Sequence, residues 1–326
     1  MLSISDLYVS FHTPAGEVKA LNGVSLDVER GEVLGVVGES GSGKSVTFSV
    51  VPGLLQKPGK VKSGSVVFDG LDMVKTSEKE LRNIRGKDIS VIFQDSMTSL
   101  NPVFTIGDQL MEMILLHMKM TRKEAREHAL QMLNLVGMSN PEARMRQYPH
   151  ELSGGMRQRV MIAMALSCKP KLLIADEPTT ALDVTIQAQI LDLINKMKRE
   201  TDAAIVMITH DLGVIAEICD RVAVMYAGMV VEYGTVDDIF YNTSHPYTKG
   251  LLACLPRLDE DRPEMLEAIE GAPVDLLLLP KGCPFAPRCK YAMNICFREM
   301  PPAFEVSENH ESLCWLCADT NLEAKK

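Results

Sequence analysis

The chain has 326 residues, of which 46% are hydrophobic and 24% are charged, and its formal net charge is −9. These values are typical of a folded protein and exclude an intrinsically disordered chain; the negative charge argues against nucleic acid as the main ligand. The length suits one large domain with an appendage, or two modest domains. No apolar run approaches the roughly 18 residues of a membrane-spanning helix and no secretory signal is recognisable, so we expect a cytosolic protein.

The first part of the chain alternates apolar and polar side chains in the manner of β-strands. Two such stretches are Leu7–Phe11 and Val24–Val28, and the turn sequence Thr13–Gly16 lies between them. We therefore expect an antiparallel β-layer here. Phe11 or Tyr8 from this layer could stack on a nucleotide base, although most aromatic side chains in strands belong to the core.

The strongest motif is a glycine-rich loop after the apolar stretch Val33–Val37. It consists of Gly38, Glu39, Ser40, Gly41, Ser42, Gly43, Lys44 and Ser45, and it fits the pattern of a phosphate-binding loop at every fixed position. Glycines let backbone N–H groups approach an anion, Lys44 can reach the β- and γ-phosphates, and the Ser45 hydroxyl can bind Mg²⁺. The loop predicts binding of a nucleoside triphosphate with its metal; the alternative is an ordinary Gly/Ser loop.

After the loop, the pattern predicts an apolar helix over Val46–Leu55 and strands over Ser65–Phe68 and Ile89–Phe93. Gln94 follows the last of these strands. A polar side chain at such a strand end could bind the metal or position a water molecule, although a glutamine there is more often merely solvated.

From about residue 97 the composition changes, and the sequence predicts a helical subdomain. Ile106–Met118 has helical spacing, and Thr121–Glu124 is a capping box that opens a helix through Leu135. A second glycine motif follows, with the sequence Ser153, Gly154, Gly155 at the start of a helix that contains Gln158. Such a turn can bind an anion through its backbone N–H groups, but taken alone it is a common turn.

Two further apolar strands end in residues suited to phosphate chemistry. Leu172–Ala175 is followed by Asp176 and Glu177, and Ala204–Thr209 is followed by His210. Neighbouring residues of a strand point in different directions, so Asp176 can hold Mg²⁺ while Glu177 reaches an attacking water. His210 is a candidate contact to the γ-phosphate.

With these motifs in this order, the chain resembles the ATP-binding subunit of an ABC transporter from Leu2 to about Gly234. The resemblance implies an α/β P-loop NTPase fold with an antiparallel β-layer and a helical subdomain. It also assigns roles: Gln94 to the Q-loop, Leu152–Gln158 to the signature, Asp176 and Glu177 to the Walker B motif, Ala181–Asp183 to the D-loop, and His210 to the switch histidine.

In this family two subunits meet head to tail, so that ATP on the phosphate loop of one is enclosed by the signature of the other. The resemblance therefore implies that Ser153, Gly154, Gly155, Gln158 and Asp183 contact nucleotide at this interface. It further implies that Mg²⁺ is held by Ser45 and Asp176, with Gln94 as a further candidate, and that Glu177 acts as the base.

The resemblance narrows to the D-type ATP-binding subunit of oligopeptide and dipeptide importers through Ser99–Pro102, His245–Thr248 and the terminal cysteines. It implies an ABC domain over residues 1–240, with its helical subdomain at about 97–160, and an extension over 241–326. The partners would be two transmembrane permease subunits, a second ATP-binding subunit and, indirectly, an extracytoplasmic peptide-binding protein, at the cytoplasmic face of the membrane. Import of nickel or another solute, or a role outside transport, remains an alternative.

The C-terminal region contains four cysteines spaced for a shared ligand: Cys283, Cys289, Cys296 and Cys314. Four thiolates suit zinc or an iron–sulfur cluster, and the spacing alone does not choose between them. The resembled subfamily implies a [4Fe–4S] cluster, for which we expect a structural role; a redox sensor is the alternative. Its pattern includes a histidine four residues before the last ligand, as in His310 before Cys314, which leaves Cys317 spare.

Overall fold

A computed structural model describes residues 1–95, 99–179, 182–254 and 269–318. It divides into two compact units that interleave along the chain. The helical unit comprises Met1, Val28–Val33 and Lys75–Ile208; the sheet unit comprises Leu2–Asp27, Leu34–Val74 and Thr209–Lys326. The domain boundary expected at residue 240 stays a prediction.

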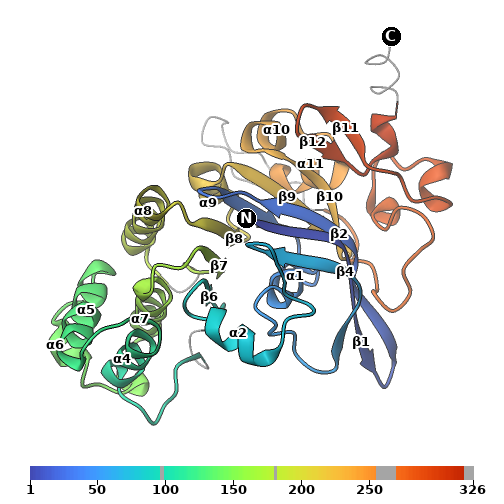
Figure 1. Ribbon diagram of the computed structural model, residues 1–326. Coiled ribbons are helices and arrows are strands. Elements are labelled where there is room, and N and C mark those ends of the chain that lie inside the picture. The colour runs from blue at the N-terminus through green and yellow to red at the C-terminus, as the bar shows by residue number, and fades with distance from the viewer. Residues whose placement is uncertain (96–98, 180–181, 255–268, 319–326) are drawn as a thin grey trace. The chain divides into compact units, whose positions relative to one another are not determined.

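The sheet unit contains a four-stranded sheet near the N-terminus (Figure 1, blue). The strand order is β2 (Gly16–Val28), β1 (Leu2–Thr13), β4 (Gly59–Phe68) and β5 (Leu71–Asp72), and β1 runs antiparallel to β4. Alternate apolar residues of β1, including Leu2 and Ile4, are buried, which agrees with the period of two along a strand that buries one face. The predicted antiparallel β-layer is confirmed.

The same unit contains a second run of hydrogen-bonded strands. Its order is β11 (Phe304–Ser307), β12 (His310–Ser312), β10 (Met229–Thr235), β9 (Arg221–Tyr226) and β3 (Val33–Val37). β3 and β9 are parallel, and the other neighbours are antiparallel. Within the residues described for this unit, the α-helices are α1 (Lys44–Val50), α9 (Leu212–Ile218), α10 (Val236–Tyr241) and α11 (Pro246–Ala253).

The C-terminal segment continues this sheet. In β12, Ser312 lies opposite Glu232 of β10, so the segment covers backbone N–H and C=O groups that would otherwise form a free edge. The sequence predicted a small cysteine-ligated module in the extension 241–326. That module is not supported, because the segment joins the sheet at β10 and no metal-binding group is found among the described residues. The pairing partner, β10, lies some eighty residues earlier in the chain, so local patterning could not indicate it.

The helical unit has three parallel strands in the order β6 (Ile89–Ile92), β7 (Leu172–Asp176) and β8 (Ala204–Ile208). The α-helices described in this unit are α2 (Glu78–Ile84), α4 (Ile106–His117), α5 (Arg122–Leu135), α6 (Pro141–Arg144), α7 (Gly154–Ser167) and α8 (Val184–Thr201). α4, α5 and α7 pack on one another (Figure 1, green). Their buried faces repeat at helical spacing, as Ala125, Ala129 and Leu133 do on α5.

The predicted capping box at Thr121 is confirmed: the Thr121 hydroxyl accepts from the Glu124 N–H, and the Glu124 carboxylate accepts from the Thr121 N–H. One predicted boundary was wrong, because α1 ends at Val50 and not at Leu55. Gly53, at φ +66°, turns the chain and donates its N–H to the Val50 carbonyl at 2.9 Å, which ends the helix. Ala181 of the predicted D-loop lies outside the described residues.

Among the residues that the structure describes, no helix combines the length and the apolar character needed to cross a membrane.

The packing of α4 gives a stability prediction. Leu110 is fully buried, whereas Leu116 on the same helix is 73% exposed. We expect Leu110→Ala to lower the free energy of unfolding by about 3 kcal/mol through lost burial and an unfilled cavity. We expect Leu116→Ala to change it by less than about 0.5 kcal/mol. Urea unfolding followed by circular dichroism compares the two, and equal losses would contradict the assigned packing.

Candidate nucleotide-binding site

The phosphate loop Gly38–Ser45 joins β3 to α1 in the sheet unit. Gly38 has φ +146°, and a Cβ atom there would overlap the Met225 carbonyl of β9. Gly43 has φ +102° and forms the left-handed N-cap of α1. Both positions therefore require glycine for a physical reason, close approach at one and backbone conformation at the other.

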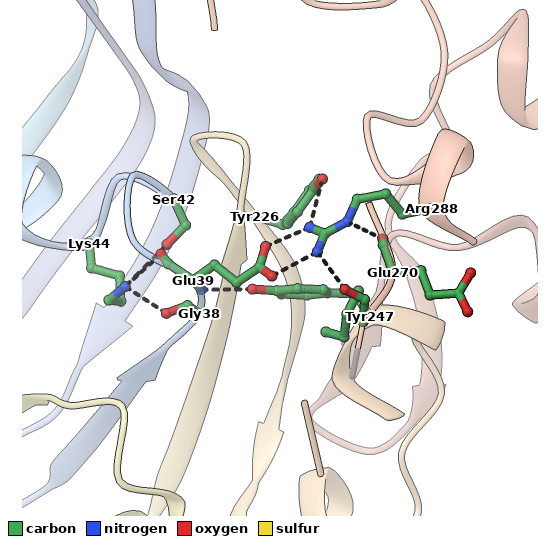
Figure 2. A network of polar contacts seen from close by, with 9 residues as sticks. Gly38, Glu39, Ser42, Lys44, Tyr226, Tyr247, Glu270 and Arg288 are labelled. Atoms are coloured by element: carbon green, nitrogen blue, oxygen red, sulfur yellow. Dashed lines mark hydrogen bonds and ion pairs between the residues drawn. The ribbon is translucent and has the colours of Figure 1, made fainter. Parts of the chain in front are cut away.

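The loop is closed around the ammonium group of Lys44. Its Nζ donates to the carbonyl oxygens of Gly38 at 2.7 Å and Glu39 at 2.9 Å, and lies 3.4 Å from the Ser42 hydroxyl (Figure 2). Ser45 follows in the first turn of α1 and is exposed. This arrangement places a cation and an exposed hydroxyl at the start of a helix, where a phosphate chain and its metal bind.

His210 belongs to the same unit as the phosphate loop. The Thr209 N–H lies 3.4 Å from the carbonyl of Val36, two residues before the loop begins. Asp211 then caps α9 by accepting from the N–H groups of Gly213 and Val214. His210 is thus held between a strand end and a helix cap, with its side chain exposed.

Of the two candidate aromatic side chains, Tyr8 is 42% exposed and Phe11 is half-buried. Phe11 lies opposite Gly59 of β4, and a Cβ atom at Gly59 would come within 2.7 Å of the Phe11 ring. Both residues lie in the sheet unit with the phosphate loop, and the choice of a base-stacking residue stays a prediction.

The helical unit brings Gln94 and Glu177 together, as the parallel strands predict. β6 and β7 are neighbours, and the Gln94 Nε2 donates to the Glu177 Oε2 at 2.9 Å. Glu177 has φ +48°, a left-handed conformation that is uncommon outside glycine, and its N–H donates to the Ile208 carbonyl of β8 at 2.8 Å. The Asp176 side chain, one residue earlier at the end of β7, is half-buried.

The glycine turn before α7 is open to solvent. The Ser153 hydroxyl caps the helix by accepting from the Met156 N–H at 3.4 Å, and a Cβ atom on Gly154 would meet no atom within 4 Å. Gly155 is half-buried. Gln158 is only 1% exposed, and its Nε2 donates to the Pro178 carbonyl at 2.9 Å. Gln158 therefore ties α7 to the residue that follows Glu177, a contact that its motif did not indicate.

Asp183 caps α8, with its Oδ1 accepting from the Ile186 N–H at 3.0 Å. Its other carboxylate oxygen lies 3.9 Å from the guanidinium of Arg159 on α7. Asp183 itself is exposed. The residues of the signature and the D-loop thus lie in one unit with Gln94 and Glu177, whereas the phosphate loop and His210 lie in the other.

The four predicted cysteine ligands all line one small cavity of about 20 Å³ in the sheet unit. Cys283, Cys289, Cys296 and Cys314 share its wall with Phe285 and Trp315. Burial raises the pKa of the Cys283 and Cys289 thiols. No group of three or more histidine, cysteine or acidic side chains in the described ranges has the geometry of a metal site. The predicted cluster is therefore not confirmed.

One contact set in this unit was not predicted. The Arg288 guanidinium makes two hydrogen bonds to the Glu39 carboxylate, at 2.6 and 2.9 Å, and the Glu39 N–H donates to the Tyr247 hydroxyl at 2.7 Å (Figure 2). Tyr247 lies in the stretch His245–Thr248, which stood out only for its resemblance to the importer family. Arg288 lies between Cys283 and Cys289, a stretch that stood out only for its cysteines. Nothing local in either stretch indicated a contact with the phosphate loop.

Comparison with known proteins gives two matching family models. The model described as ABC transporter matches residues 21–180, and the model of the oligopeptide/dipeptide transporter C-terminal region matches residues 231–296. A solved dimeric ATP-binding cassette, MJ0796 in a post-hydrolysis state with ADP and phosphate, is 28% identical with a TM-score of 0.67, and the match covers 72% of this chain and 99% of that one.

Curated relatives are similar over almost the whole chain. The oligopeptide transport ATP-binding protein OppD and the dipeptide transport ATP-binding protein DppD of Bacillus subtilis are each 55% identical over 97% of this chain, and the matches cover 88% and 94% of those proteins. OppD of Salmonella typhimurium is 55% identical over 97% of this chain and 93% of its own length. The chain therefore belongs to the ABC transporter ATP-binding proteins, in the group of oligopeptide and dipeptide transport subunits.

Proposed function

We propose that this chain is the ATP-hydrolysing motor of an importer for oligopeptides or dipeptides. The observation that carries the proposal is the 54–55% identity to several OppD and DppD proteins, which extends through the C-terminal region that is specific to these transporters. The phosphate loop, folded around Lys44, supplies the site at which the nucleotide binds.

In the proposed site, Gly38–Ser45 surrounds the β- and γ-phosphates, with Lys44 exchanging its carbonyl partners for phosphate oxygens. The hydroxyl of Ser45 and the carboxylate of Asp176 are hard oxygen donors of the kind that Mg²⁺ prefers. The metal, when bound, neutralises charge on the phosphates. Phe11 is the residue we assign to the adenine base.

Hydrolysis requires a water molecule directed at the γ-phosphorus. We assign Glu177 to orient this water and accept its proton, and the hydrogen bond from Gln94 holds the carboxylate in place. The left-handed backbone at Glu177 is the kind of strain that accumulates at active sites. His210, exposed in the unit that carries the phosphate loop, is assigned to the γ-phosphate.

The signature turn is open and capped, so its backbone N–H groups can face an anion from outside the chain. We propose that Ser153, Gly154 and Gly155 contact the nucleotide held by a second ATP-binding subunit. Asp183 lies at the same interface, and Gln158 acts from inside by holding Pro178 and hence the segment after Glu177. A single subunit then has only half of each complete site.

The permease partners would dock on the helical unit. Val103, Phe104 and Leu116 there are 71%, 51% and 73% exposed, an unusual set of exposed apolar side chains that suits contact with another protein. Attachment to two permeases would hold the chain at the cytoplasmic face of the membrane, with peptides delivered by an extracytoplasmic binding protein.

We also propose that Cys283, Cys289, Cys296 and Cys314 hold a metal centre. In the part of the chain that the structure describes, all four line one cavity, and Cys317 does not line it. A [4Fe–4S] cluster is the first candidate and zinc the second, because four thiolates suit either.

The role of Glu177 is tested by Glu177→Gln, which keeps the shape and removes the base. We expect ATP hydrolysis by the assembled transporter to fall at least about 100-fold while ATP binding is retained. Glu217→Gln, at an exposed position of α9, is the matched control and should leave the rate unchanged. Hydrolysis at the parental rate by Glu177→Gln, with the permeases present, would show that the assignment is wrong.

The cysteine site is tested by elemental analysis and acid-labile sulfide of anaerobically purified protein. We expect iron and sulfide in equal amounts, and their loss in Cys283→Ser and Cys296→Ser, because each removes one thiolate ligand. Cys168→Ser, outside the cavity, should retain the metal. Zinc in place of iron would identify the second candidate, and protein with neither metal would remove the site.

A further inference from the structure

The first half of the phosphate loop is held by residues outside the loop as well as by residues within it. Three groups of Glu39 are engaged: its carbonyl accepts from Lys44 and from the Ser42 N–H, its N–H donates to Tyr247, and its carboxylate binds Arg288 (Figure 2). By contrast, Ser40 and Gly41 are exposed, and a Cβ atom on Gly41 would meet nothing within 4 Å. The loop is therefore fixed at Glu39 and adaptable just after it.

Arg288 is in turn fixed by the C-terminal segment. Its side chain is only 5% exposed, and besides the two bonds to Glu39 it donates to the carbonyls of Glu270 at 3.0 Å and Ile269 at 3.3 Å. The bonds to Glu39 raise the pKa of Arg288, so it stays charged. A planar guanidinium with two parallel bonds defines the position of a carboxylate more narrowly than a single contact does.

The same contacts lead directly to the cysteine cavity. Arg288 ends the short 3₁₀ turn Ala286–Arg288 between Cys283 and Cys289. The ring of Phe285, the residue just before that turn, lines the cavity and packs edge-on against Tyr226 at 5.4 Å and Tyr247 at 5.3 Å between centroids. Burial raises the pKa of the Tyr247 phenol, which therefore stays neutral. A shift of the cysteine turn would thus move both groups that hold Glu39.

Two physical effects connect this arrangement to nucleotide affinity. Fixing Glu39 in advance lowers the conformational entropy that the loop loses when it binds phosphate. Arg288 also offsets the charge of a carboxylate that stands beside a site for an anion; without it, that carboxylate would repel the triphosphate.

We propose that Arg288 and Tyr247 are positioning residues for nucleotide binding, and that through them the cysteine turn 283–289 and the phosphate loop are thermodynamically coupled. By linkage, whatever orders the cysteine turn tightens nucleotide binding, and nucleotide binding orders the cysteine turn to the same extent. The coupling rests on the proposed ATP site, and it does not depend on which metal the cysteines hold.

The first test measures the affinity of the full-length protein for ATP and for ADP with Mg²⁺ by calorimetry. We expect Arg288→Ala to weaken both by about tenfold, within the usual range of coupling between sites. In the assembled transporter the KM for ATP should rise while kcat changes little, since Arg288 binds Glu39 and has no part in the proposed chemistry at the γ-phosphate. Arg298→Ala removes the same charge from an exposed position of the same segment and should have no effect.

A double-mutant cycle separates coupling from general damage. Because Glu39→Gln removes the charge that Arg288 offsets, we expect Arg288→Ala combined with Glu39→Gln to bind nucleotide better than Arg288→Ala alone. Tyr247→Phe removes only the hydroxyl and should weaken binding in a folded protein, which covers the case in which Arg288→Ala does not fold. Additive effects of the Glu39 and Arg288 changes, or unchanged affinity in Tyr247→Phe, would overturn the proposal.

The reciprocal effect can be read without activity, because Trp315 is the only tryptophan of the chain and lies in the wall of the cysteine cavity. Saturation with ADP and Mg²⁺ should change its fluorescence in the parental protein and in Arg298→Ala, and much less in Arg288→Ala. No change in the parental protein would overturn the coupling. A parental protein that binds no nucleotide, in the same way as Lys44→Ala, would instead contradict the proposed function.

Discussion

The need to close eight residues around one ammonium group determines much of this structure. Lys44 can donate to the carbonyls of Gly38 and Glu39 only if the backbone folds back at Gly38 and Gly43, both at positive φ. At Gly38 the space is taken by the Met225 carbonyl of β9, so the parallel pairing of β9 with β3 is part of the same constraint. The buried strands β3 and β9 thus hold the loop in a backbone shape that requires glycine at Gly38 and Gly43.

The second organising feature is that reactive side chains follow strands whose ends are fixed by pairing. Gln94 and Glu177 meet because β6 and β7 are parallel neighbours, and the Glu177 backbone is tied to the end of β8. The buried Gln158 adds a link from α7 to Pro178, so the solvent-exposed turn at Ser153 and the segment that follows Glu177 are parts of one hydrogen-bonded framework.

The C-terminal segment is integrated in the fold to a degree that composition did not suggest. β12 extends the sheet at β10, and Arg288 and Tyr247 hold the phosphate loop by its Glu39. The Arg288–Glu39 ion pair has two hydrogen bonds and a buried guanidinium. Burying charges is costly unless the geometry is well satisfied, so a segment that stabilised only itself would not need this contact. Arg288 lies between Cys283 and Cys289, so the cysteine turn is in direct contact with the phosphate loop.

Local sequence patterns were enough to predict the phosphate loop, the capping box at Thr121 and the strands before Asp176 and His210, and to group four cysteines that line one cavity. These depend on spacing within a few residues, where period, capping and turn chemistry act directly. The pairing of β12 with β10, and the contact of Arg288 with Glu39, one of 43 acidic residues and 249 positions away, became apparent from the folded chain. Such pairings depend on strand order and on packing between remote segments, which no local pattern encodes.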